Sequence, residues 1–361
     1  MSAPDPNRRS LLAVVGLLVA VLVIGVVVVA RSLLAPAAPA KATNARDTGA
    51  AIEAGLKAAD AYVRESKYPG AAAILEKLAE QSPTDQAVRV AYAQALIGLN
   101  RHAEAYKQYE AAISISGPPP LKAGQRMEDV PDINGLKRDP LLAHLHFEAG
   151  TCASVARMAD RAEEHYWMAQ VLDPGEARYP LYLAMIHIGK GDEAAGSASL
   201  LRALKLNPDL AEGWGTLAEL EFKKGQTGLA GQHIETARKL QPDVTRWKMV
   251  QARVLNRQGE PAQAALVLQS IPPAEQADKS VLALRAECFG LLQSPADAAM
   301  MYENAEKKNP TDRELPYQAA LWYERAGSPS LGAEQAQRAA MLGHPDAKEL
   351  EARLRRLAPG Q

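Results

Sequence analysis

The chain has 361 residues, a formal net charge of −1 and 23% charged residues. This balance excludes a polyelectrolyte tail and a strongly basic nucleic-acid-binding protein. Its two cysteines, Cys152 and Cys288, lie far apart and outside any CxxC pair, so the sequence contains no disulfide framework and no zinc ribbon. The length suits two ordinary domains or one extended repeat array.

An uncharged apolar run, Leu11–Ala30, is the first organised feature of the chain. At about 1.5 Å per residue, a helix of this length spans roughly 30 Å, the hydrocarbon thickness of a bilayer. We therefore predict a transmembrane helix over residues 11–34, between a short tail (1–10) and an Ala/Pro-rich linker (35–49). A cleaved signal peptide is the alternative, but the apolar cores of signal peptides are shorter, at about 7–15 residues.

The charges that flank this run nearly balance. Arg8 and Arg9 favour a cytoplasmic N-terminus, whereas Arg31, Lys41 and Arg46 on the other side oppose it. We predict a single-pass cell-membrane protein whose soluble part lies outside the cytoplasm, in the periplasm, with its orientation left open by these charges.

A period of 34 residues follows, marked by prolines that end helices. Pro174, Pro208 and Pro242 are spaced by this period, and Pro310 follows after two periods. With the proline as position 32, repeats begin at Ile52, Gln86, Ala143, Ala177, Ala211, Thr245, Lys279 and Arg313.

Small residues recur at two positions of every repeat. Position 8 holds Ala59, Ala93, Gly150, Ala184, Ala218, Ala252, Ala286 and Ala320, and position 20 holds Ala71, Ala105, Ala162, Gly196, Ala230, Ala264, Ala298 and Gly332. Two helices that cross at small residues pack closely, so we predict that the helices of each repeat meet there. Position 15, the expected turn, holds Asn100, Gly191, Gly225, Gly259 and Gly327, residues that tolerate a left-handed backbone.

These rows resemble those of the tetratricopeptide-repeat (TPR) family over about residues 50–345. The resemblance implies an all-α, right-handed solenoid of about eight helix pairs: two over residues 50–116, six over 140–344, and a capping helix and tail over 345–361. His187 and Glu221 at position 11 depart from the family pattern, and they suggest that these two repeats are locally loosened or shifted.

An insertion over residues 117–139 interrupts the period. Pro118, Pro119 and Pro120 end a helix, and Asp139-Pro140 starts the next one as an N-cap followed by proline. The insertion is interpreted as a disordered or surface-packed loop, or else as a loop that contacts a partner or the groove.

The sequence contains no recognisable catalytic motif. Gly189-Lys190-Gly191 lies at a helix-to-helix turn and lacks the Ser or Thr of a P-loop. His144 and His146 diverge on a helix, which predicts an exposed His144 and a packing His146, and both cysteines are expected to be buried and inert. We expect no enzyme activity, no cofactor and no metal.

Recognition of partners remains. In the TPR family, positions 2, 5, 9, 12 and 13 of the first helix line a concave groove that binds proteins or peptides. Arg246, Arg253 and Arg257 occupy positions 2, 9 and 13 of the sixth repeat, with Glu212 and Glu219 before them and Glu287 after. We interpret this row as a ladder of ion pairs between repeats; the alternative is an arginine cluster that binds an acidic partner. Arg178 and Met185 are the corresponding candidates in the fourth repeat.

The resemblance implies a membrane-anchored scaffold or adaptor that binds partner proteins during assembly of a cell-envelope complex. The alternative is a chaperone or regulatory subunit that transiently holds an extended client polypeptide.

Overall fold

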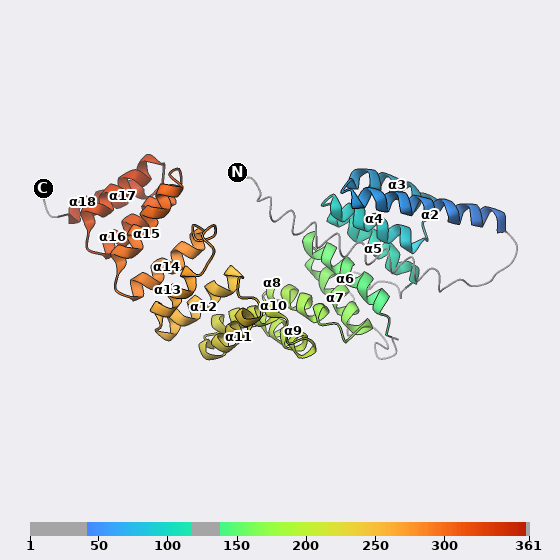
Figure 1. Ribbon diagram of the computed structural model, residues 1–361, viewed down its shortest axis with the longest axis horizontal. Helices are drawn as coiled ribbons and strands as arrows, with labels where there is room; N and C mark the ends of the chain where they lie inside the picture. The colour runs from blue at the N-terminus through green and yellow to red at the C-terminus, as the bar shows by residue number, and fades with distance from the viewer. Residues whose placement is uncertain (1–41, 117–137, 359–361) are drawn as a thin grey trace. The chain divides into compact units, whose positions relative to one another are not determined.

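The computed structural model describes residues 42–116 and 138–358. Over these residues the chain forms 17 α-helices and no strand (Figure 1). The predicted span Leu11–Ala30 lies outside the described residues, and none of the described helices is long and apolar enough to cross a membrane. The inserted loop also lies outside them, apart from its last two residues.

The chain divides into two compact units, a first lobe that ends at Leu206 and a second lobe that begins at Asn207. The first lobe contains four consecutive helix pairs. They are α2 (Ala42–Arg64) with α3 (Tyr68–Gln81), α4 (Gln86–Gly98) with α5 (His102–Ser116), α6 (Pro140–Val155) with α7 (Ala159–Leu172), and α8 (Arg178–Gly189) with α9 (Glu193–Leu206).

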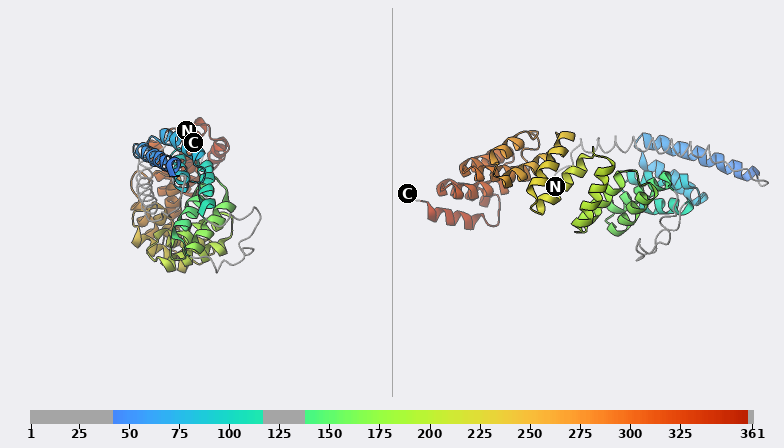
Figure 2. Two further views of the ribbon diagram at one scale, coloured as in Figure 1. Left: turned by 90° about the vertical axis from the view of Figure 1, so that its right-hand side faces the viewer. Right: turned by 90° about the horizontal axis from the view of Figure 1, so that it is seen from below.

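The second lobe contains four more pairs and one final helix. The pairs are α10 (Ala211–Lys223) with α11 (Thr227–Leu240), α12 (Thr245–Gln258) with α13 (Pro261–Gln269), α14 (Lys279–Leu291) with α15 (Pro295–Lys308), and α16 (Glu314–Arg325) with α17 (Pro329–Met341). Helix α18 (Ala347–Leu357) packs beside α17, as Figures 1 and 2 show.

The two helices of each pair meet at positions 8 and 20, as predicted, and every residue in both rows is buried. The glycines show the approach directly. A Cβ added to Gly150 at position 8 would lie 3.3 Å from the carbonyl oxygen of Ala162 at position 20. A Cβ at Gly332 would lie 3.2 Å from the carbonyl oxygen of Ala320. There is room for an alanine at most, which is why the two rows contain no larger residue.

The turn between paired helices has one backbone conformation in all eight repeats. Position 15 has a positive φ at the predicted Gly191, Gly225, Gly259, Gly327 and Asn100. The same conformation occurs at Ser66, Arg157 and Gln293, where the residue type gave no indication of it. The geometry of the repeat therefore imposes the turn even where an L side chain is strained.

The helix ends follow the predicted signals. Helices α7, α9, α11 and α15 each end two residues before the proline of position 32. Asp139 caps α6 by accepting a 2.9 Å hydrogen bond from the backbone nitrogen of Leu142. In α18, Leu350 and Leu354 are buried, whereas Leu357 is 59% exposed.

The two repeats with a polar residue at position 11 keep their packing, contrary to the expectation of a loosened or shifted register. The Glu221 carboxylate accepts a 2.7 Å hydrogen bond from His233 Nδ1 on the paired helix. His187 Nε2 lies 3.2 Å from the carboxylate of Glu163 in the preceding repeat. Each polar side chain thus has a partner, and Ala184 and Ala218 at position 8 of these repeats are fully buried.

The sixth repeat departs from the others in its second helix. Helix α13 has only nine residues, because Pro272 and Pro273 follow two residues after its end and supply no backbone N–H to extend it. The buried Lys248 donates a 2.8 Å hydrogen bond from Nζ to the carbonyl oxygen of Ser270, just past the end of α13. The connection Ser270–Asp278 therefore lies against the helix pair and reaches α14.

Candidate functional site

The arginine row on α12 is the first candidate. Arg246 forms an ion pair with Glu219 on α10, with 2.9 Å between Nε and Oε1, and this hydrogen bond raises the pKa of the guanidinium. The guanidinium also lies 4.9 Å from the ring centroid of Trp247. Arg246 thus forms the predicted ion pair between neighbouring repeats.

Arg257 also contacts the preceding repeat, but not through a carboxylate. Its guanidinium lies 4.2 Å from the ring centroid of Phe222 and donates a 3.3 Å hydrogen bond to the carbonyl oxygen of that residue. A cation–π contact of this kind is worth about 0.5–1 kcal/mol at an exposed site. Arg257 therefore has a structural role at the end of α12.

Arg253 differs from both of these arginines. Its side chain is exposed and has no hydrogen bond or ion pair with any described residue. Glu287, which was expected to pair with the row, forms no ion pair with it in the described part of the chain. The prediction of an ion-pair ladder is thus wrong at Arg253. Of the three arginines, only Arg246 forms an ion pair with a described carboxylate, that of Glu219.

A groove of about 590 Å³ lies beside this row, within the second lobe. Helix α12, the Ser270–Asp278 connection and the start of α14 form most of its lining. Its charged lining residues are Glu219, Arg246, Arg253, Glu275 and Asp278. The groove therefore contains three of the predicted site residues, Glu219, Arg246 and Arg253, and within the described part of the chain Arg253 alone of the three has no partner.

The two remaining predicted residues lie in the first lobe, on α8. Arg178 pairs with Glu176 at 3.0 Å, and its guanidinium lies 5.4 Å from the ring centroid of Phe147. Met185 is half-buried. The exposed Tyr182 forms an edge-to-face contact with Phe147, with 5.0 Å between ring centroids, so an aromatic cluster surrounds this arginine.

The sequence did not indicate the partner of the buried His146 in the first lobe. His146 and His165 are both buried, and their Nδ1 atoms lie 3.0 Å apart. Burial lowers the pKa of His146 to about 4 and that of His165 to about 3. Burial also raises the pKa of Glu148 to about 7, although Arg178 opposes the shift. The position of His146 in the sequence gave no indication that a second histidine, His165, would lie against it.

Other predicted side chains are placed as follows. Both cysteines are buried, as expected, and burial raises the pKa of Cys152 to about 12. His146 is buried, as expected, but His144 is half-buried beside Glu148 rather than exposed.

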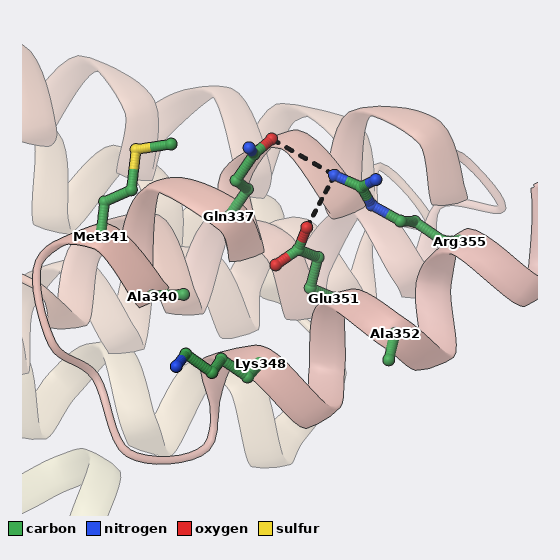
Figure 3. A pocket seen from close by; sticks show the side chains of 7 residues that line it. All are labelled: Gln337, Ala340, Met341, Lys348, Glu351, Ala352 and Arg355. Atoms are coloured by element: carbon green, nitrogen blue, oxygen red, sulfur yellow. Dashed lines mark hydrogen bonds and ion pairs between the residues drawn. The ribbon is translucent and has the colours of Figure 1, made fainter.

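A second groove, between α17 and α18, provides a contrast (Figure 3). Its one arginine, Arg355, pairs with Glu351 at 2.7 Å and donates a 3.4 Å hydrogen bond to Gln337. Figure 3 shows these three side chains pointing toward one another across the groove. The charge of this arginine is therefore already matched, unlike that of Arg253.

Comparisons with known proteins find the same kind of repeat as the spacing of the small residues. The family described as "Tetratricopeptide repeat" matches residues 62–118, and the family described as "Psidin, N-terminal TPR repeats region" matches residues 221–344. A search of curated protein sequences finds no match.

Two solved structures share the fold. One comes from the functional characterisation of Pseudomonas aeruginosa pilF; it is 15% identical and covers 67% of this chain and 99% of its own, with a TM-score of 0.52. The other is a tetratricopeptide-repeat protein from Parabacteroides merdae; it is 14% identical and covers 74% of this chain and 97% of its own, with a TM-score of 0.50. The spacing of the small residues, the helix pairs and these family matches together identify the chain as a tetratricopeptide-repeat protein.

Proposed function

We propose that this protein is a membrane-anchored scaffold or adaptor that binds partner proteins on the first helices of its repeats. TPR proteins mediate protein–protein interactions. The observation that carries the proposal is the groove along α12, where Arg253 is exposed and has no partner among the described residues. An exposed charge beside a groove is free to bind a partner without first breaking an internal ion pair.

The anchor and the location are parts of the same proposal. The uncharged run Leu11–Ala30 has the length of a membrane span, and the soluble part then lies in the periplasm, where it gathers proteins of an envelope complex. A reporter that is active only outside the cytoplasm, fused after Gln361, is expected to be active. Activity of a cytoplasmic reporter at the same position would reverse the orientation.

Site-specific photo-crosslinking tests the binding surface. A photoreactive residue replaces Met249, which is half-buried in the groove, in the full-length chain expressed in cells. The control position is Leu266 on α13, which is 67% exposed and does not line the groove. We expect one or a few discrete crosslinked partners from position 249 and none of these from position 266.

The outcome also separates the scaffold from the alternative function. A broad smear of many weakly crosslinked proteins at position 249 would favour a chaperone that holds extended clients. Equal crosslinking at both positions, or no crosslinking at either, would contradict binding in this groove.

A further inference from the structure

The groove along α12 contains charges of both signs, and most of them are already engaged. Glu219 is paired with Arg246. The Asp278 carboxylate accepts hydrogen bonds from the hydroxyl and the backbone nitrogen of Ser280, so it serves as the N-cap of α14. The charges of the pair are matched within the protein, and the carboxylate of the cap is already bound to the start of α14.

Two charges remain, one of each sign. Arg253 comes from α12, and Glu275 comes from the connection between α13 and α14. Both side chains are exposed, neither has a partner among the described residues, and they do not form an ion pair with each other. The half-buried Met249 and Ala277 line the same groove and add an apolar surface.

This charge distribution disfavours a partner segment of uniform sign. Five charged residues line the groove, two arginines and three carboxylates. Because Glu219 and Arg246 neutralise each other, a uniformly acidic segment is repelled by Glu275 and Asp278, and a uniformly basic segment by Arg253. Like charges brought together across an interface lower affinity and exclude wrong partners, so the groove discriminates by charge pattern.

We infer that the groove binds a mixed-charge polypeptide segment, in which an acidic side chain contacts Arg253, a basic side chain contacts Glu275, and an apolar side chain between them packs on Met249. This inference rests on the proposed function and specifies the kind of partner that the groove fits. Contacts of this type are exposed, so they give selectivity more than affinity.

Selection from a library of random short peptides, displayed on phage, tests the inference with the full-length chain in detergent micelles. We expect the wild-type protein to enrich peptides with an acidic and a basic residue on either side of an apolar one. Arg253→Glu is expected to remove the acidic residue from the enriched pattern, and Glu275→Arg the basic one. Each reversal should weaken a wild-type-selected peptide about tenfold, a loss of about 1.4 kcal/mol.

The double variant Arg253→Glu/Glu275→Arg provides the decisive arm. It is expected to bind a version of the selected peptide in which the acidic and basic residues have been exchanged, and to bind the original peptide poorly. Arg202→Glu is the matched control, because Arg202 is an exposed helical arginine on α9 outside the groove. It should leave the enriched pattern unchanged. Thermal melts of all variants should coincide with that of the wild type.

Three results would overturn the inference: enrichment of uniformly charged peptides, no enrichment of any pattern, or a wild-type pattern in Arg253→Glu. These results are distinguishable from failure of the proposed function. Discrete crosslinks at Met249 together with peptide selection that does not depend on charge would support the scaffold function and contradict only the mixed-charge partner. Absence of crosslinks at Met249 would contradict the proposal that this groove is the binding surface.

Discussion

Single small residues set how closely the helices of each repeat approach. Ala218 and Ala230, at positions 8 and 20 of the fifth repeat, are both fully buried where α10 packs on α11. This contact was readable from the sequence because the requirement is steric and recurs in every repeat. A side chain larger than that of alanine would have to displace a backbone, so no compensating substitution hides the pattern.

Enlarging one of these residues should therefore destabilise the protein. We expect Ala218→Leu to lower the free energy of unfolding by about 1–3 kcal/mol, because the added atoms overpack the crossing point of α10 and α11. Urea unfolding monitored by circular dichroism measures the change. Ala198→Leu, at an exposed position of α9, is the control and should have almost no effect. A neutral result for Ala218→Leu would contradict the repeat register.

The left-handed turn residues show what the sequence could not reveal. Glycine and asparagine indicate a positive φ, but Arg157 and Gln293 adopt it only because the neighbouring helices fix the turn. We expect Arg157→Gly to raise the free energy of unfolding by about 0.5–1 kcal/mol, by relieving the strain of an L residue in this conformation. The same change in mid-helix, Arg202→Gly, should instead lower it by about 1 kcal/mol. Equal effects at the two positions would refute the interpretation.

At the scale of helices, the pairing was predictable and the polar contacts within it were not. The period and its prolines indicated eight pairs, and the helices follow. His187 and Glu221 were visible as polar residues at an apolar position, but their partners Glu163 and His233 lie in other helices. These side chains come together only when the helices pack. The polar residue at position 11 alone therefore suggested a loosened repeat, whereas in the structure it is hydrogen-bonded to its partner.

The buried histidines make the α6–α7 pair sensitive to acid. His146 and His165 have lowered pKa values in the folded state, about 4 and about 3, so the folded protein keeps them neutral below the ordinary histidine pKa of 6.5. The unfolded chain takes up protons first as the pH falls. The stability of this pair is therefore complete above about pH 6.5 and declines below it, by at most about 1.4 kcal/mol per pH unit for each histidine.

Hydrogen exchange at about pH 7.5 and about pH 5, corrected for intrinsic rates, measures this loss. We expect protection in α6 and α7 to fall more than in α16 and α17. The double variant His146→Leu/His165→Leu should lose this extra sensitivity, because it has no imidazole to protonate. An unchanged difference in the double variant would show that other groups cause the acid sensitivity.

At the scale of the whole molecule, the repeats bury their apolar faces on one another. Each helix pair packs on the next within its lobe, and α18 covers the last pair with Leu350 and Leu354. We expect a chain without residues 1–40 to be soluble and highly helical, because no described repeat needs the bilayer to cover its core. Gel filtration and circular dichroism measure both properties. Aggregation or low helicity of the shortened chain would contradict this account.

The location of the candidate site was predictable from the sequence, but which of its arginines is unpaired was not. The helical register put Arg246, Arg253 and Arg257 on one face, and the groove lies along that face. The sequence did not reveal which arginine is free, because that depends on the reach of individual side chains. Trp247 and Phe222 contact the guanidinium groups of Arg246 and Arg257, whereas Arg253 has no such neighbour among residues 42–116 and 138–358.

Affinity capture with Arg253→Glu tests the central claim most directly. Full-length wild-type, Arg253→Glu and Arg202→Glu chains are purified from cells, and their bound partners and melting temperatures are compared. We predict that Arg253→Glu loses the partners captured by the wild type while its melting temperature is unchanged, since the reversal breaks no ion pair that the structure describes. Arg202→Glu should retain both partners and stability. Partners retained by Arg253→Glu would contradict a role for Arg253 in partner binding, and a melting temperature lowered in this variant alone would show that Arg253 stabilises the fold instead.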